Sequence, residues 1–374
     1  MTISLEIVHP RRRPPMICRG CVIEGKLPGS ACRTEFGSAV APCLYHFVDS
    51  RMSEHSTTSN QGSQLAKESE SDGYFISAEG RKGDHDRLNI QHQMWNLLMN
   101  GPCPISDVEL DDLLKPGPPN DSVPTVLDIG SGSGIWSFEI ARAYPHAKVT
   151  GFDVAPFHST NALDNFSFIQ GNLLDGLQQF YDQFDLVHIR TVLLHIKSDK
   201  QSWAIEEFIR CLRPGGLIIL SDWDEIFLDE FGQRLPAARD DDKPEAQGTW
   251  MLRIFNEMFA REDGPESVMR FRVRDALLDN KRIDKETIKA VVYRMPVGWD
   301  GGNLNIENGD ALGRLSRIDL MDGFEKAKPL LRMRGISEEV IRQWEQHSDD
   351  ETSARSRRAV TRLHSTWARA LKLE

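Results

Sequence analysis

Positive charge is scarce in this chain of 374 residues, where 45 Lys and Arg stand against 56 Asp and Glu and leave a formal net charge of −11. Domains that bind nucleic acid usually carry a clustered basic face that neutralises phosphates. The acidic balance therefore argues against a nucleic-acid partner. The 40% of hydrophobic and 27% of charged residues are typical of a globular protein.

Long apolar runs are also missing. A membrane-spanning helix needs roughly 18 to 20 consecutive apolar residues, and the runs that look buried are short, such as residues 217–220. This excludes a membrane role. The N-terminus runs into Arg11, Arg12 and Arg13 with no apolar core, so it does not resemble a secretory signal. We expect a cytoplasmic protein, with the nucleus as the alternative.

Cysteine is rare as well, since six in so long a chain are too few for a disulfide scaffold and should be free thiols. Cys18 and Cys21 form a C-x-x-C, followed by Cys32, Cys43 and His46. Tetrahedral zinc sites usually combine two closely spaced ligand pairs, and only one pair is present. We therefore expect no metal site.

The chain divides into a polar leader and a folded domain. Residues 53–73 contain almost nothing that could be buried and offset the entropy of ordering. Met52 would make a natural start, so residues 1–51 can be an upstream extension. We predict a disordered N-terminal extension over residues 1–73 and one domain over residues 74–374.

Within that domain, residues 123–222 alternate short strand-like runs with helical patterns, which indicates a parallel sheet built from βαβ units. We expect strands at 126–129, 148–153, 166–169, 184–189 and 217–221. A helix at 86–99 precedes this core. A helical insert at about 223–286 and a C-terminal segment of strand and helices at 287–374 follow it, with a last edge strand at 365–371. The predicted fold class is α/β, a doubly wound and mostly parallel sheet.

A glycine-rich loop follows the first expected strand. Asp128 and Ile129 lead into Gly130, Gly132 and Gly134, with Ser131 and Ser133 between them, and a helix opens directly afterwards. Glycines there let the backbone approach a ligand that lies across the helix N-terminus. Asp153 ends the second strand, where a carboxylate can accept hydrogen bonds from a ribose diol. This order predicts a cofactor that contains a nucleoside.

Charge and spacing select among such cofactors. Dinucleotides place a pyrophosphate over G-x-G-x-x-G, and here the third glycine comes one residue early. Asp128 would repel phosphates but attract the ammonium of a methionine group. S-adenosylmethionine carries an ammonium and a sulfonium and no phosphate. We therefore predict S-adenosylmethionine and disfavour an NAD-dependent oxidoreductase.

These residues resemble the class I S-adenosylmethionine-dependent methyltransferases, and more closely their fungal LaeA-like group. The matching segments are residues 126–136, 151–154, 184–190 and 212–216, with 87–93 upstream and 296–299 downstream. The resemblance covers about residues 74–372. It implies a Rossmann-like methyltransferase domain with an N-terminal helical lid, and it is specific for cofactor and fold but much less for substrate.

Carried over residue by residue, the resemblance implies that Asp128, Gly130 and Gly132 hold the methionine end of the cofactor and that Asp153 holds the ribose. Asn172 would meet the adenine; many relatives have an acid there, although an amide can still pair with the adenine edge. The full set expected to bind the cofactor is Gln91, Asp128, Gly130, Ser131, Gly132, Gly134, Asp153, Val154, Asn172, Leu173 and Arg190.

Transfer of a methyl group from a sulfonium can be catalysed largely by positioning the acceptor. If the acceptor is a hydroxyl, a base within hydrogen-bond reach helps, and His195 lies just beyond the fourth strand. The alternative is a histidine packed on an apolar helix. Asp222 and Trp223 follow the fifth strand and are predicted to bind the substrate, with a solvated loop as the alternative.

Two functions fit this pattern. The first is a methyltransferase of fungal secondary metabolism that methylates a small molecule at oxygen or nitrogen, with the insert and the N-terminal helix forming the acceptor pocket. The second is a LaeA-like nuclear regulator that acts through protein partners. The donor motif cannot separate them, because a regulator can retain the donor.

Overall fold

A computed structural model describes residues 84–117, 123–157, 163–240, 248–259, 269–353 and 358–372. The predicted disordered extension and the C-x-x-C pair lie outside these ranges. Among the described residues, no helix is both long and apolar enough to cross a membrane.

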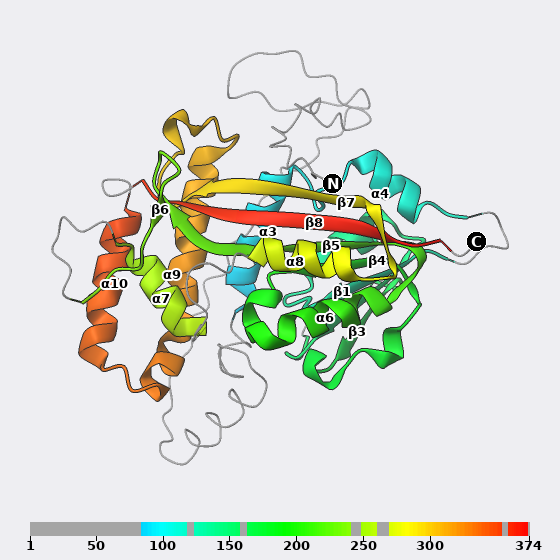
Figure 1. The fold of residues 1–374 in the computed structure, drawn as a ribbon, viewed down its shortest axis with the longest axis horizontal. Helices are drawn as coiled ribbons and strands as arrows, with labels where there is room; N and C mark the ends of the chain where they lie inside the picture. Colours follow the sequence, from blue (N-terminus) through cyan, green and yellow to red (C-terminus); the bar gives the residue numbers. More distant parts are fainter. Residues whose placement is uncertain are drawn as a thin grey trace, which may run out of the picture. The chain divides into compact units, whose positions relative to one another are not determined.

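One mixed sheet runs through the described residues in the order β3-β2-β1-β4-β5-β8-β7, and β6 pairs with β5 (Figure 1). The strands from β3 to β5 pair in parallel, whereas β8 is antiparallel to both β5 and β7. This is the doubly wound, mostly parallel α/β fold that the sequence predicts. The strands are β1 (Thr125–Ile129), β2 (Lys148–Asp153), β3 (Phe166–Gln170), β4 (Phe184–Arg190), β5 (Leu212–Leu228), β6 (Arg234–Leu235), β7 (Ile283–Pro296) and β8 (Val360–Ala370).

Helices precede, alternate with and follow these strands. The α-helices are α3 (His85–Met99), α4 (Asp107–Leu114), α5 (Ile135–Ala143), α6 (Ser198–Arg210), α7 (Trp250–Phe259), α8 (Met269–Asp279), α9 (Gly309–Met333) and α10 (Glu338–Thr352). The short 3₁₀ helices are η1 (Leu173–Asp175), η2 (Gln178–Phe180), η3 (Leu193–His195) and η4 (Gly302–Leu304).

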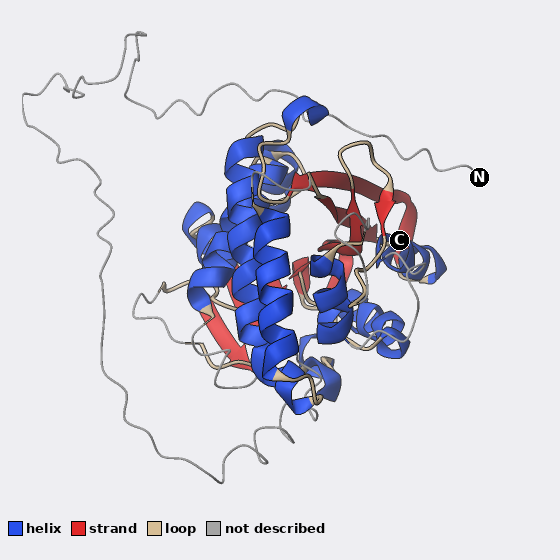
Figure 2. Cartoon of the chain, turned by 90° about the vertical axis from the view of Figure 1, so that its left-hand side faces the viewer, coloured by secondary structure: helices blue, strands red, loops and turns tan. Residues whose placement is uncertain are grey.

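Both faces of the central strands are buried, because successive side chains of a strand point to opposite faces. In β1, Val126 packs in a cluster with residues of α4 and α5, whereas Leu127 packs in a cluster with residues of α6 and α8. A separate cluster joins α7, α9 and α10. Figure 2 shows helices in front of the strands when the molecule is viewed from the left of Figure 1.

Two predictions at the sheet are wrong. The fifth strand does not end at Ser221, because β5 continues to Leu228 by pairing with β8, with Asp222 opposite His364 and Trp223 opposite Leu363. The helical insert therefore cannot begin at residue 223, and residues 222–225 form no loop. The last strand is not at an edge either, since β8 lies between β5 and β7.

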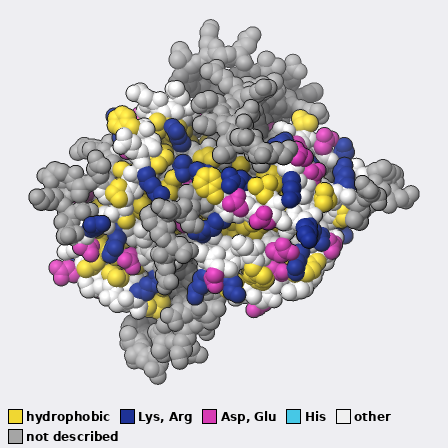
Figure 3. Space-filling model, in the orientation of Figure 1, with side chains coloured by type: hydrophobic (Ala, Val, Ile, Leu, Met, Phe, Trp, Pro, Cys, Tyr) yellow, Lys and Arg dark blue, Asp and Glu magenta, His cyan; other side chains and the backbone are white. Residues whose placement is uncertain are grey.

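Charged side chains of both signs are interspersed on the face in Figure 3, where Lys and Arg lie close to Asp and Glu. Exposed ion pairs among the described residues include Arg314 with Asp310 and Arg317 with Asp349.

Candidate functional site

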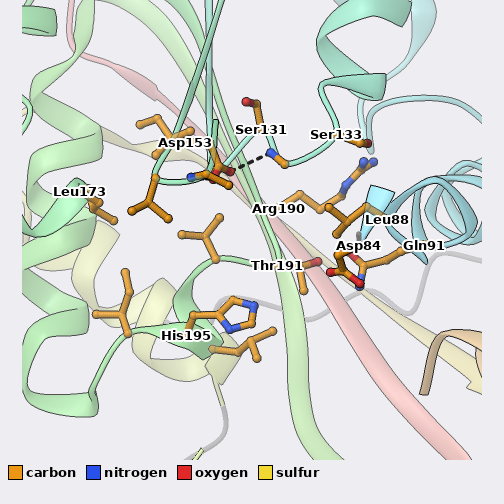
Figure 4. Close-up of a pocket in the computed structure, with 18 of the residues that line it drawn as sticks. Asp84, Leu88, Gln91, Ser131, Ser133, Asp153, Leu173, Arg190, Thr191 and His195 are labelled. Atoms are coloured by element: carbon orange, nitrogen blue, oxygen red, sulfur yellow. Dashed lines mark hydrogen bonds between the residues drawn. The ribbon is translucent and has the colours of Figure 1, made fainter. Parts of the chain in front are cut away.

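A cavity of about 420 Å³ opens where β1, β2 and β4 end, and residues of α3, α7 and α9 complete its walls. The carboxyl ends of parallel strands are where open α/β sheets bind their ligands. Figure 4 shows Asp153 and Ser131 on one side of this cavity and His195 on another, with Thr191 and Arg190 also lining it.

The glycine loop after β1 has a backbone shape that other residues adopt only with strain. Gly130 has φ +70°, and a Cβ there would lie 2.3 Å from Cγ2 of Val192. Gly134, which caps the N-terminus of α5, has φ +73°, and a Cβ there would lie 2.5 Å from Cε2 of Phe157. The glycines therefore allow the loop to pass close to Val192, just after β4, and to form one wall of the cavity.

Asp153 is fixed at this wall by two backbone groups. Its Oδ2 accepts a hydrogen bond from the Gly132 N–H at 2.8 Å, and its Oδ1 accepts one from the Ala155 N–H at 2.8 Å. A carboxylate oxygen can accept more than one hydrogen bond, so these contacts orient the group without using up its capacity. The geometry suits the ribose diol that the sequence predicts for this position.

Asp128 also lines the cavity, but its carboxylate is 3% exposed and already engaged. Oδ2 accepts from Ser137 Oγ at 2.5 Å, and Oδ1 lies 2.8 Å from Nδ1 of His188. Burial lowers the pKa of His188, although the Asp128 carboxylate opposes that shift. The His188 ring stacks on Trp136 at 3.6 Å between centroids. Ser137 and His188 therefore hold the Asp128 carboxylate in place at the cavity wall.

Arg190, at the end of β4, is oriented by the helix that covers the site. Its Nη2 donates to Nδ1 of His92 at 3.0 Å, and Nε2 of that ring lies 2.9 Å from Glu139 Oε2. Burial lowers the pKa of Arg190 to about 10, which still leaves the guanidinium charged at neutral pH. Desolvation likewise lowers the pKa of His92. The neutral His92 ring, on α3, thus links the Arg190 guanidinium to the Glu139 carboxylate on α5.

Three polar atoms around the glycine loop are buried and lack a hydrogen-bond partner among the residues that the structure describes. They are Oγ of Ser131, Nη1 of Arg190 and Oγ1 of Thr191, and all three residues line the cavity. Buried polar groups are normally satisfied, so these atoms indicate that polar groups of bound ligands meet this part of the cavity. The cation of Arg190 and the carboxylate of Asp128 together fit the amino-acid end of S-adenosylmethionine. The carboxylate of that ligand would meet Arg190, and its ammonium would meet Asp128.

The structure places most of the predicted cofactor set around this one cavity. Val154, Asn172, Leu173 and Gln91 line it together with the loop, Asp153 and Arg190, and Gly134 does not. Asn172 caps η1, its Oδ1 accepting from the Leu174 N–H at 3.0 Å. The side-chain NH₂ of Asn172 is the group that can reach an adenine edge.

The two residues predicted to bind substrate have different fates. Trp223 lines the cavity, although it belongs to β5 and is only 4% exposed. Asp222 is 1% exposed and lies outside the lining, so the structure does not bring it to the cavity as the substrate prediction requires. Its carboxylate accepts backbone N–H bonds from Leu193, Leu194 and Trp223 instead. Because side chains alternate along a strand, only one of these neighbours can face the cavity.

His195, the predicted base, lies at the end of η3 and lines the cavity, its ring 5.7 Å from that of Phe259.

Sequence reasoning missed a charged cluster on another wall of the cavity. There Arg87 binds both oxygens of Asp84, at 2.8 and 2.5 Å, and Asp319 Oδ1 at 3.0 Å. Gln91 Nε2 lies 3.4 Å from Asp319 Oδ2. Asp319 comes from α9, more than 200 residues after its partners, and no local pattern signals the pairing.

The apolar side of the cavity comes from α7, which lies within the insert that was expected to help form the acceptor pocket. Met251 and Ile254 are buried, and the same helix face lines the cavity. The helical spacing of those residues is a signal that could have identified the wall. The predicted insert contributes through α7, whereas α8 packs against α6, β5, β7 and β8.

Residues 126–216 match a family model described as a methyltransferase domain. These residues run from β1 into β5 and so include the glycine loop, Asp153 and Arg190.

Curated relatives match over longer stretches. The secondary metabolism regulator laeA of Coprinopsis cinerea is 32% identical over 139 residues, which cover 37% of this chain and 34% of the regulator. The methyltransferase pytC of Aspergillus terreus is 25% identical over 249 residues, covering 65% of this chain and 67% of that protein. The chain spans between 34% and 40% of the length of the first three curated relatives that it matches. A sarcosine dimethylglycine methyltransferase structure from Galdieria sulphuraria, described as a putative enzyme, is 13% identical; the match covers 72% of this chain and 83% of that one, with a TM-score of 0.38.

Proposed function

We propose that this chain is a class I S-adenosylmethionine-dependent methyltransferase of the LaeA-like fungal group and that it methylates a small molecule of secondary metabolism. The proposal rests on the continuity of the cavity. Its lining includes the glycine loop and Asp153 and extends without a break to His195 and α7. A donor and a small acceptor can therefore lie side by side in one enclosure.

The residues of the donor side fit S-adenosylmethionine. Asp153 would hold the ribose diol, and Arg190 and Asp128 would hold the carboxylate and ammonium of the methionine end. Asn172 and Leu173 would border the adenine. The donor supplies a methyl group on a sulfonium, which is already a good leaving group.

The contribution of the protein is then mainly positional. Asp153 is fixed by two backbone N–H groups and Arg190 by His92, so both are oriented before a ligand binds. His195 can take a proton from a hydroxyl acceptor at its ring nitrogen.

A regulatory role through protein partners is the second candidate, and the similarity to the regulator laeA supports it. The enclosed space beyond the donor residues favours the enzyme, since a regulator that only binds partners has no need of it. We further propose that the enzyme acts in the cytoplasm. Cys103 and Cys211, the described cysteines, are both buried free thiols, which suits a reducing compartment.

Mass spectrometry tests the proposed reaction. The protein would be incubated with S-adenosylmethionine that carries a CD₃ group and with a panel of phenols, amines and carboxylic acids. We expect a mass gain of one CD₃ group on a subset of acceptors, and loss of that gain in Arg190→Met. Specific capture of protein partners together with no transfer to any panel member would favour the regulatory role instead.

A further inference from the structure

One side of the cavity is a continuous apolar surface, which we call the apolar wall and define as Trp223, Met251, Ile254, Phe255, Met258 and Phe259. Five of these residues lie on α7 at positions i, i+3, i+4, i+7 and i+8, so they share one face of the helix. The side chains of Met, Ile and Phe offer a ligand dispersion contacts and no hydrogen bonds. The wall therefore selects for apolar surface on the acceptor.

The aromatic residues of the apolar wall form a row of neighbouring rings that ends at His195. The Trp223 and Phe255 rings are 6.3 Å apart between centroids, Phe255 and Phe259 are 4.8 Å apart, and Phe259 lies 5.7 Å from the ring of His195. Rings at such spacings pack well against another flat ring in offset or edge-to-face geometry. A planar acceptor on this surface would present its edge to His195.

The charged groups of the neighbouring wall pair with one another, so none of them stands as an isolated charge. Arg87 donates to both carboxylate oxygens of Asp84 and to Oδ1 of Asp319. Gln91 donates to the remaining oxygen of Asp319. All four carboxylate oxygens of this cluster thus accept a bond from the protein itself. Lys197 and Lys200 line the cavity too, but both are exposed, so water screens their charge.

Thr191 adds a polar group to the lining of the same cavity. Its φ of +59° is unusual for a β-branched residue, and its N–H is tied to the Ser221 carbonyl at 2.8 Å. Its Oγ1 is buried in the cavity lining and has no hydrogen-bond partner in the described part of the chain. Strained residues that persist cluster at ligand sites, and a hydroxyl can both donate to and accept from a bound hydroxyl.

Resting on the proposed function, we infer that the methyl acceptor is an uncharged, planar and largely apolar phenol, which packs on the apolar wall and hydrogen-bonds through its hydroxyl to Thr191. Transfer forms a bond between the phenol oxygen and the methyl carbon. The carbon–sulfur bond breaks with its electron pair remaining on sulfur, and the phenol proton passes to the His195 ring.

Calorimetric titration of the full chain with three probes of the same ring tests this inference without requiring turnover. The probes are 2-naphthol, which is neutral, 2-naphthoate, an anion, and 2-naphthylmethylammonium, a cation. We expect 2-naphthol to bind about 10-fold more tightly than either ion, because burying an unpaired charge is costly. S-adenosylmethionine is titrated separately, so that failure of the donor site, which would refute the proposed function, is distinguished from failure of the acceptor site.

Two variants assign the binding. Thr191→Val keeps the β-branched shape and should weaken 2-naphthol binding about 3- to 10-fold, the loss of one hydrogen bond. Phe255→Ala should weaken it about 10-fold, while Phe231→Ala, at a residue 81% exposed and outside the lining, should leave it unchanged. Donor affinity in each variant shows that the fold is intact.

Tightest binding by the cation would overturn the inference and indicate that the Asp84 and Asp319 cluster reads an amine. Failure of all three probes to bind a protein that binds S-adenosylmethionine would also overturn it. Unchanged 2-naphthol affinity in Thr191→Val would remove Thr191 from the acceptor site.

Discussion

Replacing Asp153 with alanine should separate ligand binding from folding more sharply than other changes at the loop. The carboxylate is expected to accept hydrogen bonds from the ribose hydroxyls, and bonds to a charged group contribute about 1.5–3 kcal/mol each. Counting imperfect geometry, we expect the affinity for S-adenosylmethionine to fall by about 2–3 kcal/mol, or about 30- to 150-fold. Calorimetric titration of both proteins measures this directly.

The same change also disturbs the loop, because Asp153 accepts from the N–H groups of Gly132 and Ala155. Both donors stand at the cavity wall, where water can replace the lost partner, so the free energy of unfolding should fall by only about 1–2 kcal/mol. Asp153→Asn is the matched control, since its amide oxygen can keep one of the two backbone bonds while the charge is lost. Urea unfolding reports the stability of each variant.

A folded Asp153→Ala variant that binds S-adenosylmethionine within 3-fold of the wild type would refute the assignment of the ribose site. A variant that loses binding only because it unfolds would be recognised by its urea transition. Intermediate loss of affinity in Asp153→Asn with near-normal stability is the result that the geometry predicts.

Further predictions concern the loop, the covering helix and the sheet. Gly130→Ala should lower the free energy of unfolding by at least about 2 kcal/mol, from its positive φ and its approach to Val192, and Val192→Ala should restore part of it; strict additivity of the two changes by urea denaturation would contradict the predicted contact. Arg87→Met leaves two buried carboxylates unpaired and should cost about 3 kcal/mol, whereas Arg314→Met, in an exposed pair, should cost less than about 1 kcal/mol; equal losses would argue against the buried cluster. Burial raises the pKa of Asp222 from 3.8 to about 6, so the folded state binds the carboxyl proton more tightly than the unfolded state. Protonation of Asp222 therefore adds to the free energy of unfolding below about pH 4, and this stabilisation is lost as the pH rises through 6. Asp222→Asn cannot lose this proton, so its free energy of unfolding relative to the wild type should rise by about 2–3 kcal/mol between pH 4 and pH 8. A difference in unfolding free energy that stays constant across that range would rule out the raised pKa.

Local signals explain why the donor side could be predicted from sequence. The glycines and Asp153 follow strands directly, and a parallel sheet brings the ends of neighbouring strands together whatever else the chain does. Backbone conformation carries less signal. Nothing in the residues around Thr191 predicts its positive φ. That conformation depends on how the chain leaves β4, where the Thr191 N–H donates to the Ser221 carbonyl.

Long-range pairing explains what sequence reasoning missed. The end of β5 could not be predicted because residues 222–228 are held in the sheet by β8, about 140 positions later. That pairing buries Asp222 and turns Trp223 to the cavity. Asp319 reaches Arg87 only because α9 packs against α3, and helix packing of this kind leaves no mark on a local pattern.

The most direct test of a donor site for S-adenosylmethionine is calorimetric titration of the purified chain with S-adenosylmethionine and S-adenosylhomocysteine, with NADH as the control. We predict micromolar binding of both sulfur ligands at one site per chain and no heat of binding with NADH. Binding of NADH, or failure of both sulfur ligands to bind a folded protein, would contradict the donor assignment.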